Sequence, residues 1–323
     1  MGNGKSLRNI LVQLNDVFIR EPRLIWRYYR PFSWKKSESR NIFMVDGRTG
    51  HGGMFDRLKG IISVYAISKA QQKDFRIHFI YPFELEKYLE PNEYDWRIDA
   101  NDINYHYPST RPLFLYGECY APRRLFKQRD HESHFYFGYN ILDEINARYA
   151  THYEWGQLYR ELFRPTSYLQ QYIDQYQKEI GDNYVVFHAR FLNLLGDKVE
   201  TAINPELPEA EREPLMQKLR DKMLELKSQL TGNPRIMLAS DSMTFINYML
   251  RAVPGIYVVP GTVKHIDTAG NTDDSENVKM FLDYHLIAHA SKVYNIVAPG
   301  MWPSAFPEYA AKIGGAEFER LFI

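Results

Sequence analysis

The 323-residue sequence contains a single cysteine, Cys119, so no disulfide can form within the chain. A lone thiol fits a reducing compartment. No apolar run approaches the roughly 18 residues of a transmembrane helix, and the first residues lack the apolar centre of a signal peptide. We therefore expect a soluble protein of the cytoplasm.

Net charge is also absent, because 40 Lys and Arg residues balance 40 Asp and Glu residues. Nucleic-acid binding usually needs a basic surface, so the balance argues against such a partner. One stretch, 20–36, is basic and aromatic and departs from this balance of charge. We expect a solvated arm packed on its domain there, with peripheral contact to an anionic membrane as the alternative. The oligomeric state is left open.

Several common active-site motifs are missing. The glycines at 47–53 form neither a Gly-x-Gly-x-x-Gly fingerprint nor a loop ending in Gly-Lys-Ser/Thr. His285 and His289 are four residues apart, but no third metal ligand accompanies them, so we expect core or surface roles for both. The sequence therefore predicts no metal and no resident cofactor.

Strand-like and helix-like segments alternate along most of the chain, which is typical of an α/β protein with parallel sheets. Pro165 breaks a helical pattern, and Thr166 or Ser167 can cap the next helix, so the boundary between two domains falls there. We expect domains at 1–165 and 166–323. Strands are predicted at 41–45, 75–82, 111–120, 183–191, 234–242, 255–260 and 292–299, and helices at 54–73, 132–163, 167–181, 207–230, 244–253, 276–291 and 304–315.

Polar residues follow three predicted strands of the second domain. His188 and Arg190 follow the apolar run "YVVF", Asp241 follows "IMLA", and a turn containing Ser304 follows "YNIVA". Ligands of open α/β sheets bind where strands end and helices begin, and a helix N-terminus with an arginine suits a phosphate. Each feature alone also has a structural explanation, as a core residue or a helix cap. Their coincidence in one domain predicts a pyrophosphate site.

The stretch "VDGRTGHGGMF" in the first domain contains four glycines within 47–53, between a predicted strand and a predicted helix. Glycine costs backbone entropy and is kept where the chain turns tightly or approaches something closely. The polar side chains of this loop include Arg48 and His51. We therefore expect the loop to approach a ligand.

These segments resemble the GDP-fucose-dependent fucosyltransferases, a superfamily that includes α1,2-, α1,6- and protein O-fucosyltransferases and the nodulation fucosyltransferase. "GRTGHGG" resembles its Gly-Arg-x-Gly-Asn loop, and "LFRPTSYLQQYIDQY" with "YVVFHARF" resembles its FRPS helix and His-x-Arg motif. "FLDYHLIAHASKVYNIVAPGMWPSAF" is similar to its C-terminal motif. The resemblance covers about residues 41–70 and 160–313.

The resemblance implies a GT-B fold, with two Rossmann-like domains facing across a cleft. It implies an inverting, metal-independent glycosyltransferase that moves fucose from GDP-fucose to a glycan hydroxyl, and we expect a role in bacterial surface-polysaccharide synthesis. Arg190 would hold the β-phosphate and stabilise the departing GDP. The other donor-binding positions that we expect, from the resemblance and from the strand ends together, are Arg48, Gly50, His188, Asp241, Asp283, Ser304, Ala305 and Phe306.

His51 is the loop side chain that can take up a proton near neutral pH without a large pKa shift, so it is the candidate general base. Asp46 and Asp56 are rivals, and His51 serving only to position the acceptor is the alternative. The chain also departs from the family pattern, because His51 replaces an Asn and Phe-Leu-Asn follows Arg190. Another nucleotide-sugar donor, or a non-catalytic relative that binds nucleotide or glycan, therefore remains an alternative.

Overall fold

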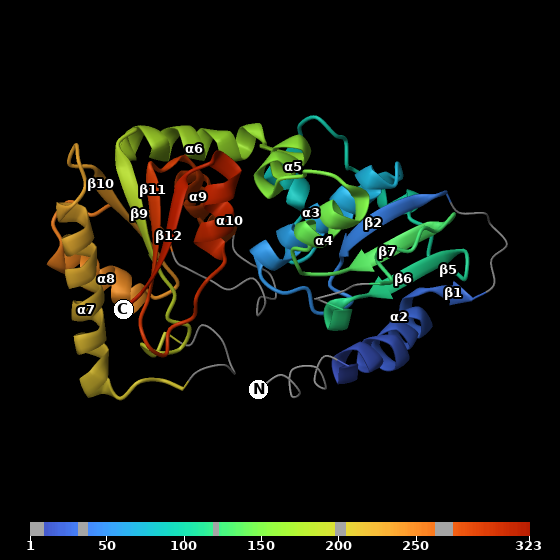
Figure 1. Cartoon of the computed structure of the whole chain (residues 1–323), viewed down its shortest axis with the longest axis horizontal. Coiled ribbons are helices and arrows are strands. Elements are labelled where there is room, and N and C mark those ends of the chain that lie inside the picture. The colour runs from blue at the N-terminus through green and yellow to red at the C-terminus, as the bar shows by residue number, and fades with distance from the viewer. Residues whose placement is uncertain (1–9, 32–37, 119–122, 198–204, 262–273) are drawn as a thin grey trace. The chain divides into compact units, whose positions relative to one another are not determined.

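The chain divides into two compact units, unit 1 at Met1–Arg164 and unit 2 at Pro165–Ile323. The computed structural model describes residues 10–31, 38–118, 123–197, 205–261 and 274–323. Each unit has its own four-stranded parallel sheet with helices beside it (Figure 1). Cys119 lies outside the described residues. Among the described helices, none is both long enough and apolar enough to cross a membrane.

The unit 1 sheet has the strand order β3-β2-β7-β6. The strands are β2 (Arg40–Val45), β3 (Asp74–Phe79), β6 (Thr110–Phe114) and β7 (Glu132–Tyr136). Every neighbouring pair is parallel. From β2 the chain goes to β3 on one side, whereas β6 and β7 lie on the other. The order therefore reverses between β2 and β7, which is where parallel sheets usually bind ligands.

Helix α3 (Met54–Ala70) follows the glycine loop and is buried along most of its length. It lies so close to the chain after β7 that a Cβ atom on Gly60 would be 2.2 Å from the carbonyl oxygen of Phe137. A side chain at position 60 would push the helix away from the sheet. This glycine therefore serves helix packing rather than the loop before it.

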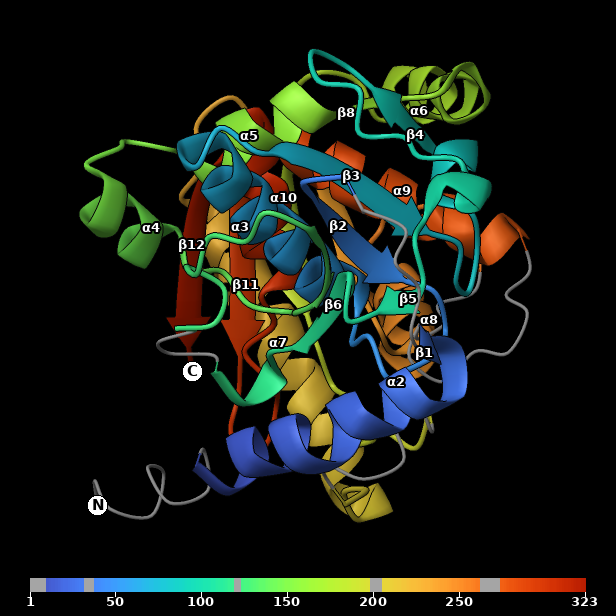
Figure 2. The same cartoon turned by 90° about the vertical axis from the view of Figure 1, so that its right-hand side faces the viewer.

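Shorter elements complete unit 1. The segment 10–15 is helical, and a π-helical turn, Asp16–Arg20, joins it to α2 (Glu21–Tyr28). Figure 2 shows α2 alongside β6, against which it packs. The remaining elements are β1 (Arg30–Pro31), β4 (Leu89–Pro91), β5 (His106–Tyr107), β8 (Phe163–Pro165), α4 (Leu142–Tyr149), α5 (Trp155–Leu162) and 3₁₀ turns at Leu85–Lys87, Ala100–Asp102 and Tyr116–Glu118.

The prediction of a mostly helical segment at 132–163 is wrong at its start, because β7 is a strand inside the sheet. Its sequence, "ESHFY", begins with three polar residues and gives no apolar strand signal. All three are nevertheless buried. Polar partners on other elements offset the desolvation of two of them, Glu132 and His134.

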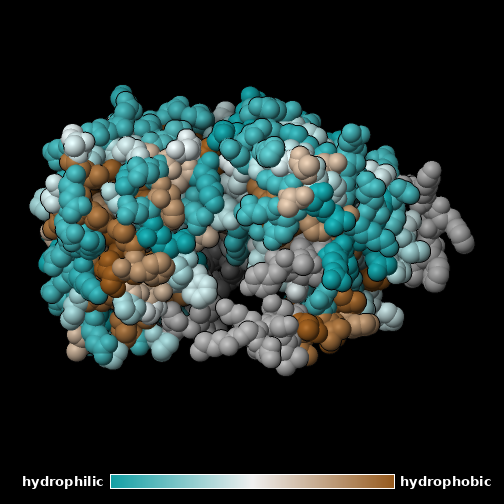
Figure 3. All heavy atoms as spheres, in the orientation of Figure 1, coloured by the Kyte–Doolittle hydropathy of each residue, from teal (hydrophilic) through white to brown (hydrophobic). Residues whose placement is uncertain are grey.

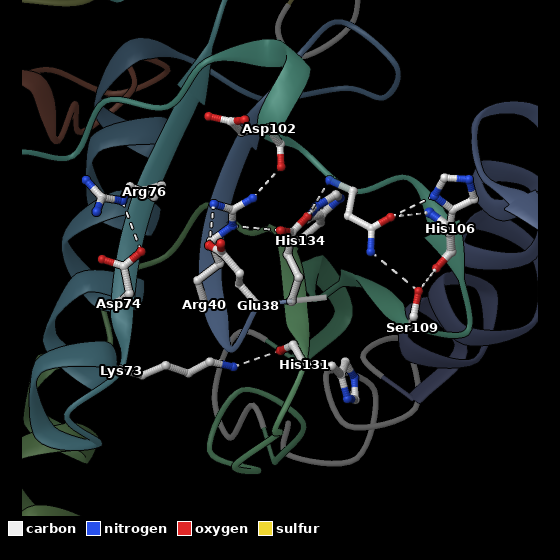
Figure 4. Close-up of polar contacts among 12 residues, drawn as sticks. Glu38, Arg40, Lys73, Asp74, Arg76, Asp102, His106, Ser109, His131 and His134 are labelled. Atoms are coloured by element: carbon white, nitrogen blue, oxygen red, sulfur yellow. Dashed lines mark hydrogen bonds and ion pairs between the residues drawn. The ribbon is translucent and has the colours of Figure 1, made fainter. Parts of the chain in front are cut away.

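Those partners form a buried charged network in unit 1 (Figure 4). Arg40 Nε donates to Glu132 Oε2 at 2.7 Å, and Glu132 Oε1 lies 2.7 Å from His134 Nε2. Burial alone would raise the pKa of Glu132, but the hydrogen bond and charge of His134, the Asn104 N–H and Arg40 lower it. On the other side of the ring, His134 Nδ1 lies 2.6 Å from the Tyr29 hydroxyl. The network therefore joins β2 and β7 to the residue that follows α2.

Unit 2 has the strand order β10-β9-β11-β12, again with every neighbouring pair parallel. The strands are β9 (Tyr184–Ala189), β10 (Arg235–Ser240), β11 (Lys292–Val297) and β12 (Glu317–Phe322). The chain passes from β9 to β10 on one side and then to β11 on the other. The order therefore reverses between β9 and β11, and a ligand site is expected at their carboxyl ends.

Helices cover both faces of this sheet, which explains why β9 is buried at every residue. Helices α7 (Glu209–Ser228) and α8 (Met243–Ala252) share one apolar core with β9, β10 and β11. Helix α9 (Asp274–His289) packs against α10 (Phe306–Gly314) and against α6 (Ser167–Ile180). The hydroxyl of Thr166 caps α6 by accepting from Leu169 N, as the sequence predicts.

One strand prediction for unit 2 is wrong, and one strand was not predicted. The strand expected at 255–260 is reduced to one isolated bridge between Tyr257 and Met237. The chain instead forms β12, which the sequence does not reveal because "EFERLF" mixes charged and apolar residues at a half-exposed edge. β12 adds Arg320 to the sheet beside β11.

Replacing Glu132 by Gln tests the network in unit 1. The substitution keeps the shape of the side chain but leaves the buried Arg40 without its buried counter-charge. We expect the free energy of unfolding of unit 1 to fall by roughly 3–5 kcal/mol in urea titrations. Glu38→Gln is the matched control, because Glu38 pairs with the same guanidinium from a side chain that is 77% exposed. Equal losses in both variants would contradict a central role for the network.

Candidate functional site

Three polar side chains stand in register across the unit 2 sheet where the strand order reverses. His188 on β9 pairs with Asn295 on β11, which pairs with Arg320 on β12. Asn295 Nδ2 and an Arg320 NH2 group both donate to the carbonyl oxygen of Ser304, each at 3.0 Å. The sheet therefore fixes the turn that leads into α10.

That turn brings together the three residues predicted around it. Ser304 is 1% exposed, and its Oγ accepts from Phe306 N at 3.2 Å. Ala305 is the N-cap residue of α10, and Phe306 is its first residue. The ring of Phe306 stacks on His188 with centroids 6.0 Å apart. The N-terminal end of α10 thus lies beside the end of β9, and its dipole favours an anion there.

His188 is fully enclosed at this end of the sheet. Burial lowers its pKa to about 3, and the charge of Arg190 acts in the same direction. The ring is therefore neutral at physiological pH. A neutral ring suits hydrogen bonding and stacking rather than charge neutralisation of a ligand, so positive charge near this ring comes from Arg190 and Arg320.

Asp241, at the end of β10, holds the loop that carries Arg190. Its Oδ1 accepts from Phe191 N at 2.8 Å, and its Oδ2 accepts from Leu192 N at 2.9 Å. Leu192 has φ of 57°, a left-handed conformation that costs energy for a branched side chain. Arg190 Nε lies 3.8 Å from Asp241 Oδ2. The carboxylate therefore fixes the backbone of the loop and lies within ion-pair distance of the guanidinium.

The electrostatics of Asp241 agree with such a role. Burial raises its pKa to about 6, while the two backbone N–H groups and Arg190 oppose the rise. The carboxylate thus remains mostly ionised at neutral pH in spite of its burial.

Asp283 lies on α9, apart from this constellation. It is buried, and its described polar partner is Lys279, whose Nζ is 3.1 Å from Asp283 Oδ2 and also donates to the carbonyl of Val259. Burial raises the pKa of Asp283, and Lys279 opposes the rise. No described hydrogen bond joins it to the residues around Ser304.

Arg48, Gly50 and His51 belong to unit 1, at the reversal of strand order between β2 and β7. The loop turns sharply, because Gly47 and Gly52 both have left-handed backbones, with φ of 75° and 71°. Asp46 Oδ1 accepts from Arg48 N at 3.0 Å, and Asp46 Oδ2 accepts from the Tyr136 hydroxyl at 2.9 Å. Tight turns therefore account for Gly47 and Gly52, two of the four glycines of the loop.

His51 is buried within this loop and holds its two ends together. Its Nε2 accepts from Gly47 N at 3.0 Å, and its carbonyl accepts from the Tyr116 hydroxyl. Burial lowers its pKa to about 4, against the opposing effect of Asp46. A neutral imidazole has one accepting nitrogen, and the Gly47 N–H occupies it. The geometry argues against proton abstraction by His51 and shows the ring holding the loop itself.

The sequence did not single out three of the residues that build these sites. Asn295 is a polar interruption of the apolar run "VYNIV", which is a usable signal. Arg320 could be placed in the site only once β12 was known to pair with β11. Arg57 donates to the carbonyl of Gly52 at 2.9 Å and to that of Tyr81 at 2.7 Å, yet in sequence it is one of many arginines.

The two histidines on α9 form no metal site with other described residues. His285 is buried, which lowers its pKa to about 3, and its carbonyl oxygen lies 2.7 Å from His289 Nδ1. Across the described part of the chain, no group of three or more His, Cys, Asp or Glu side chains is arranged to hold a metal ion.

No protein-family model matches the chain, and no curated protein matches it in sequence. Solved structures do. The chain is similar to the NodZ α1,6-fucosyltransferase crystallised with GDP, at 15% identity and a TM-score of 0.55, over 85% of this chain and 92% of that one. NodZ from Bradyrhizobium without stated ligand matches at 14% identity and a TM-score of 0.56, over 85% of this chain and 93% of that one.

A plant enzyme matches as well. A mutant of Arabidopsis thaliana FUT1 in complex with GDP gives 11% identity and a TM-score of 0.57, over 93% of this chain and 73% of that one. At such identities the likeness is one of fold. The resemblance to fucosyltransferases seen in short motifs is thus confirmed for the architecture.

The anchoring role of His51 has a pH signature. Its folded pKa, about 4, lies below the ordinary value of 6.5, so the unfolded chain binds the proton more readily and stability is lost as pH falls between these values. We expect the wild type to lose on the order of 2–3 kcal/mol more than His51→Gln between pH 7 and pH 4 in urea unfolding.

At pH 7, His51→Ala should cost about 1–3 kcal/mol, because the Gly47 N–H loses its acceptor, whereas the amide of His51→Gln can restore much of the loss. Equal stability of the Ala and Gln variants would contradict anchoring.

Proposed function

We propose that the chain is an inverting glycosyltransferase that transfers fucose from GDP-fucose to a glycan hydroxyl. The observation that carries the proposal is the arrangement of Arg190, the neutral His188 and the N-terminal end of α10 where the unit 2 strand order reverses. Such an arrangement suits a diphosphate. The fold likeness to GDP-bound fucosyltransferases supports GDP as the nucleotide.

In this proposal the acceptor hydroxyl attacks the anomeric carbon of fucose while the bond from that carbon to the β-phosphate oxygen breaks. Negative charge grows on the departing GDP. Arg190 lies where it can stabilise that charge, which lowers the barrier more than it tightens ground-state binding. Asp241 contributes by fixing the loop and the direction of the guanidinium.

The remaining donor contacts are assigned by position. The N–H group of Ala305, at the N-terminal end of α10, would receive a phosphate, while Ser304 shapes the turn by accepting from Phe306 N. His188 would contact the nucleotide from beside Phe306. Asp283 would accept from a guanine base, as the resemblance implies, and its burial beside Lys279 makes it the least supported of these assignments by the described contacts.

We further propose that unit 1 is the acceptor side and that the two units are the halves of a GT-B enzyme. The proton lost by the acceptor passes to solvent or to Asp56, whose side chain is 48% exposed, since the accepting nitrogen of His51 is already used and the side chain of Asp46 is buried with both oxygens hydrogen-bonded. The chemistry as written requires no metal, because Arg190 and α10 supply the positive charge. The expected glycan is a bacterial surface-polysaccharide precursor, which acceptor screening with GDP-fucose tests.

Thermal stability against a panel of GDP, UDP, CMP and ADP tests the donor assignment. GDP at a hundredfold excess over its dissociation constant should add roughly 2.7 kcal/mol to the free energy of unfolding. Arg190→Ala should abolish the shift, whereas Arg251→Ala, which removes an exposed arginine from α8, should keep it.

Three results would change the assignment. A shift with UDP alone would retain the fold and replace the donor. A shift with GDP in a chain that neither hydrolyses GDP-fucose nor transfers from it would indicate a non-catalytic binding protein. The absence of any nucleotide shift would contradict the proposed site.

A further inference from the structure

A pocket of about 460 Å³ opens in unit 1 between the N-terminal helices and the glycine loop. Its size falls within the roughly 300–1,000 Å³ of small-molecule sites. Cationic, aromatic and backbone groups make up most of its wall. The residues that the argument uses are Arg20, Arg23, Arg27, Tyr28, Arg48 and Phe114.

Four arginines line this pocket, and no Asp or Glu residue is among its lining residues. Arg48 is held between two rings, with its guanidinium carbon 5.0 Å from the Tyr28 centroid and 4.2 Å from the Tyr105 centroid. Arg20 lies 5.1 Å from the Phe114 ring and pairs with Asp16 at 3.1 Å. Both side chains are thus held in place before any ligand arrives.

Arg23 and Arg27 are exposed and one helical turn apart on α2. Neither forms an ion pair with a described residue. The acidic residues of the same segment are turned inward, where Asp16 accepts from Gly117 N and Glu21 accepts from Phe114 N and Arg124. The positive charge of α2 therefore faces the pocket without compensation from its own segment.

The buried network that contains His134 (Figure 4) also fixes the end of α2. Tyr29, directly after α2, lies 2.6 Å from His134 on β7. A fixed helix lowers the entropy cost of ordering arginine side chains around a ligand. Guanidinium groups bind phosphate and carboxylate oxygens in pairs. The exposed ring of Tyr28, in the pocket wall, offers an apolar surface that suits the face of a sugar.

We propose that this pocket binds an anionic group, a phosphate or a carboxylate, carried by the acceptor glycan. The inference rests on the proposed glycosyl transfer, because it assigns the charge of the acceptor of that reaction. A neutral acceptor would provide no counter-charge for Arg23 and Arg27.

Two other anions could occupy the arginines. One is the pyrophosphate of the donor. The other is an anionic membrane, since large apolar and aromatic side chains are exposed on the same helical segment, including Phe18 at 71% and Trp26 at 88%. Figure 3 shows hydrophobic residues on the surface of unit 1 as well as of unit 2. The volume and the ring-lined wall of the pocket favour a sugar, and the experiment separates all three.

The test compares binding of three probes, N-acetylglucosamine 1-phosphate, glucuronic acid and N-acetylglucosamine, to the full chain by calorimetry. We expect the two charged sugars to bind about tenfold or more tightly than the neutral one, with a preference that weakens as salt is added. Arg23→Gln/Arg27→Gln should remove the preference. Lys218→Gln/Arg251→Gln, which removes two exposed cations of unit 2, should retain it.

The GDP-induced thermal shift is measured on the same proteins. A normal shift in Arg23→Gln/Arg27→Gln, with the charged-sugar preference lost, supports the proposal. Loss of both, with competition between GDP and the charged sugars, would assign the pocket to the donor and overturn it. No GDP shift in the wild type, with charged sugars still preferred, would refute the proposed function alone.

Equal binding of charged and neutral sugars to the wild type would also overturn the proposal. Co-sedimentation with phosphatidylglycerol vesicles tests whether these arginines bind an anionic membrane. If the wild type sediments, Arg23→Gln/Arg27→Gln does not, and no sugar preference exists, the arginines serve a membrane surface instead.

Discussion

The Asp241 carboxylate, bonded to two backbone N–H groups of the loop after β9, is the constraint on which the unit 2 site depends. It holds Leu192 in a left-handed conformation and lies 3.8 Å from the Arg190 guanidinium. A buried carboxylate with a raised pKa is costly, and proteins retain such groups where geometry matters more than stability. Here the geometry is the direction of one arginine at the reversal of strand order.

In unit 1, buried polar side chains hold a glycine loop rather than the loop of an arginine. Its glycine loop is held by Asp46, His51 and Arg57, and a second charged network places α2 over that loop. Both sites lie at carboxyl ends of parallel strands, where backbone groups converge without being used by the sheet. In unit 2 the result is an arginine beside a helix N-terminus, and in unit 1 it is a pocket rich in arginine.

Local patterns were enough to predict much of this. Apolar runs bounded by turns predicted β2, β9, β10 and β11, and polar residues directly after strands pointed to His188, Arg190, Asp241 and Ser304. What the sequence hid depends on distant partners. β7 is polar in sequence and buried in the fold because Arg40, from another strand, pairs with Glu132. Asn295 and Arg320 join the site only through strand pairing, which no short motif encodes.

The roles within the glycine loop were hidden for the same reason. Spacing identified His51 as a titratable side chain, but the Gly47 N–H that occupies its accepting nitrogen appears only when the loop closes on itself. Burial then moves its pKa to about 4, away from the range in which it could serve as a base.

Hydrogen–deuterium exchange with and without GDP tests the central claim most directly. The account predicts slower exchange in two segments of unit 2, the loop after β9 that contains Phe191 and Leu192, and the first turn of α10. Protection confined to the glycine loop of unit 1, or no protection in either unit, would contradict it.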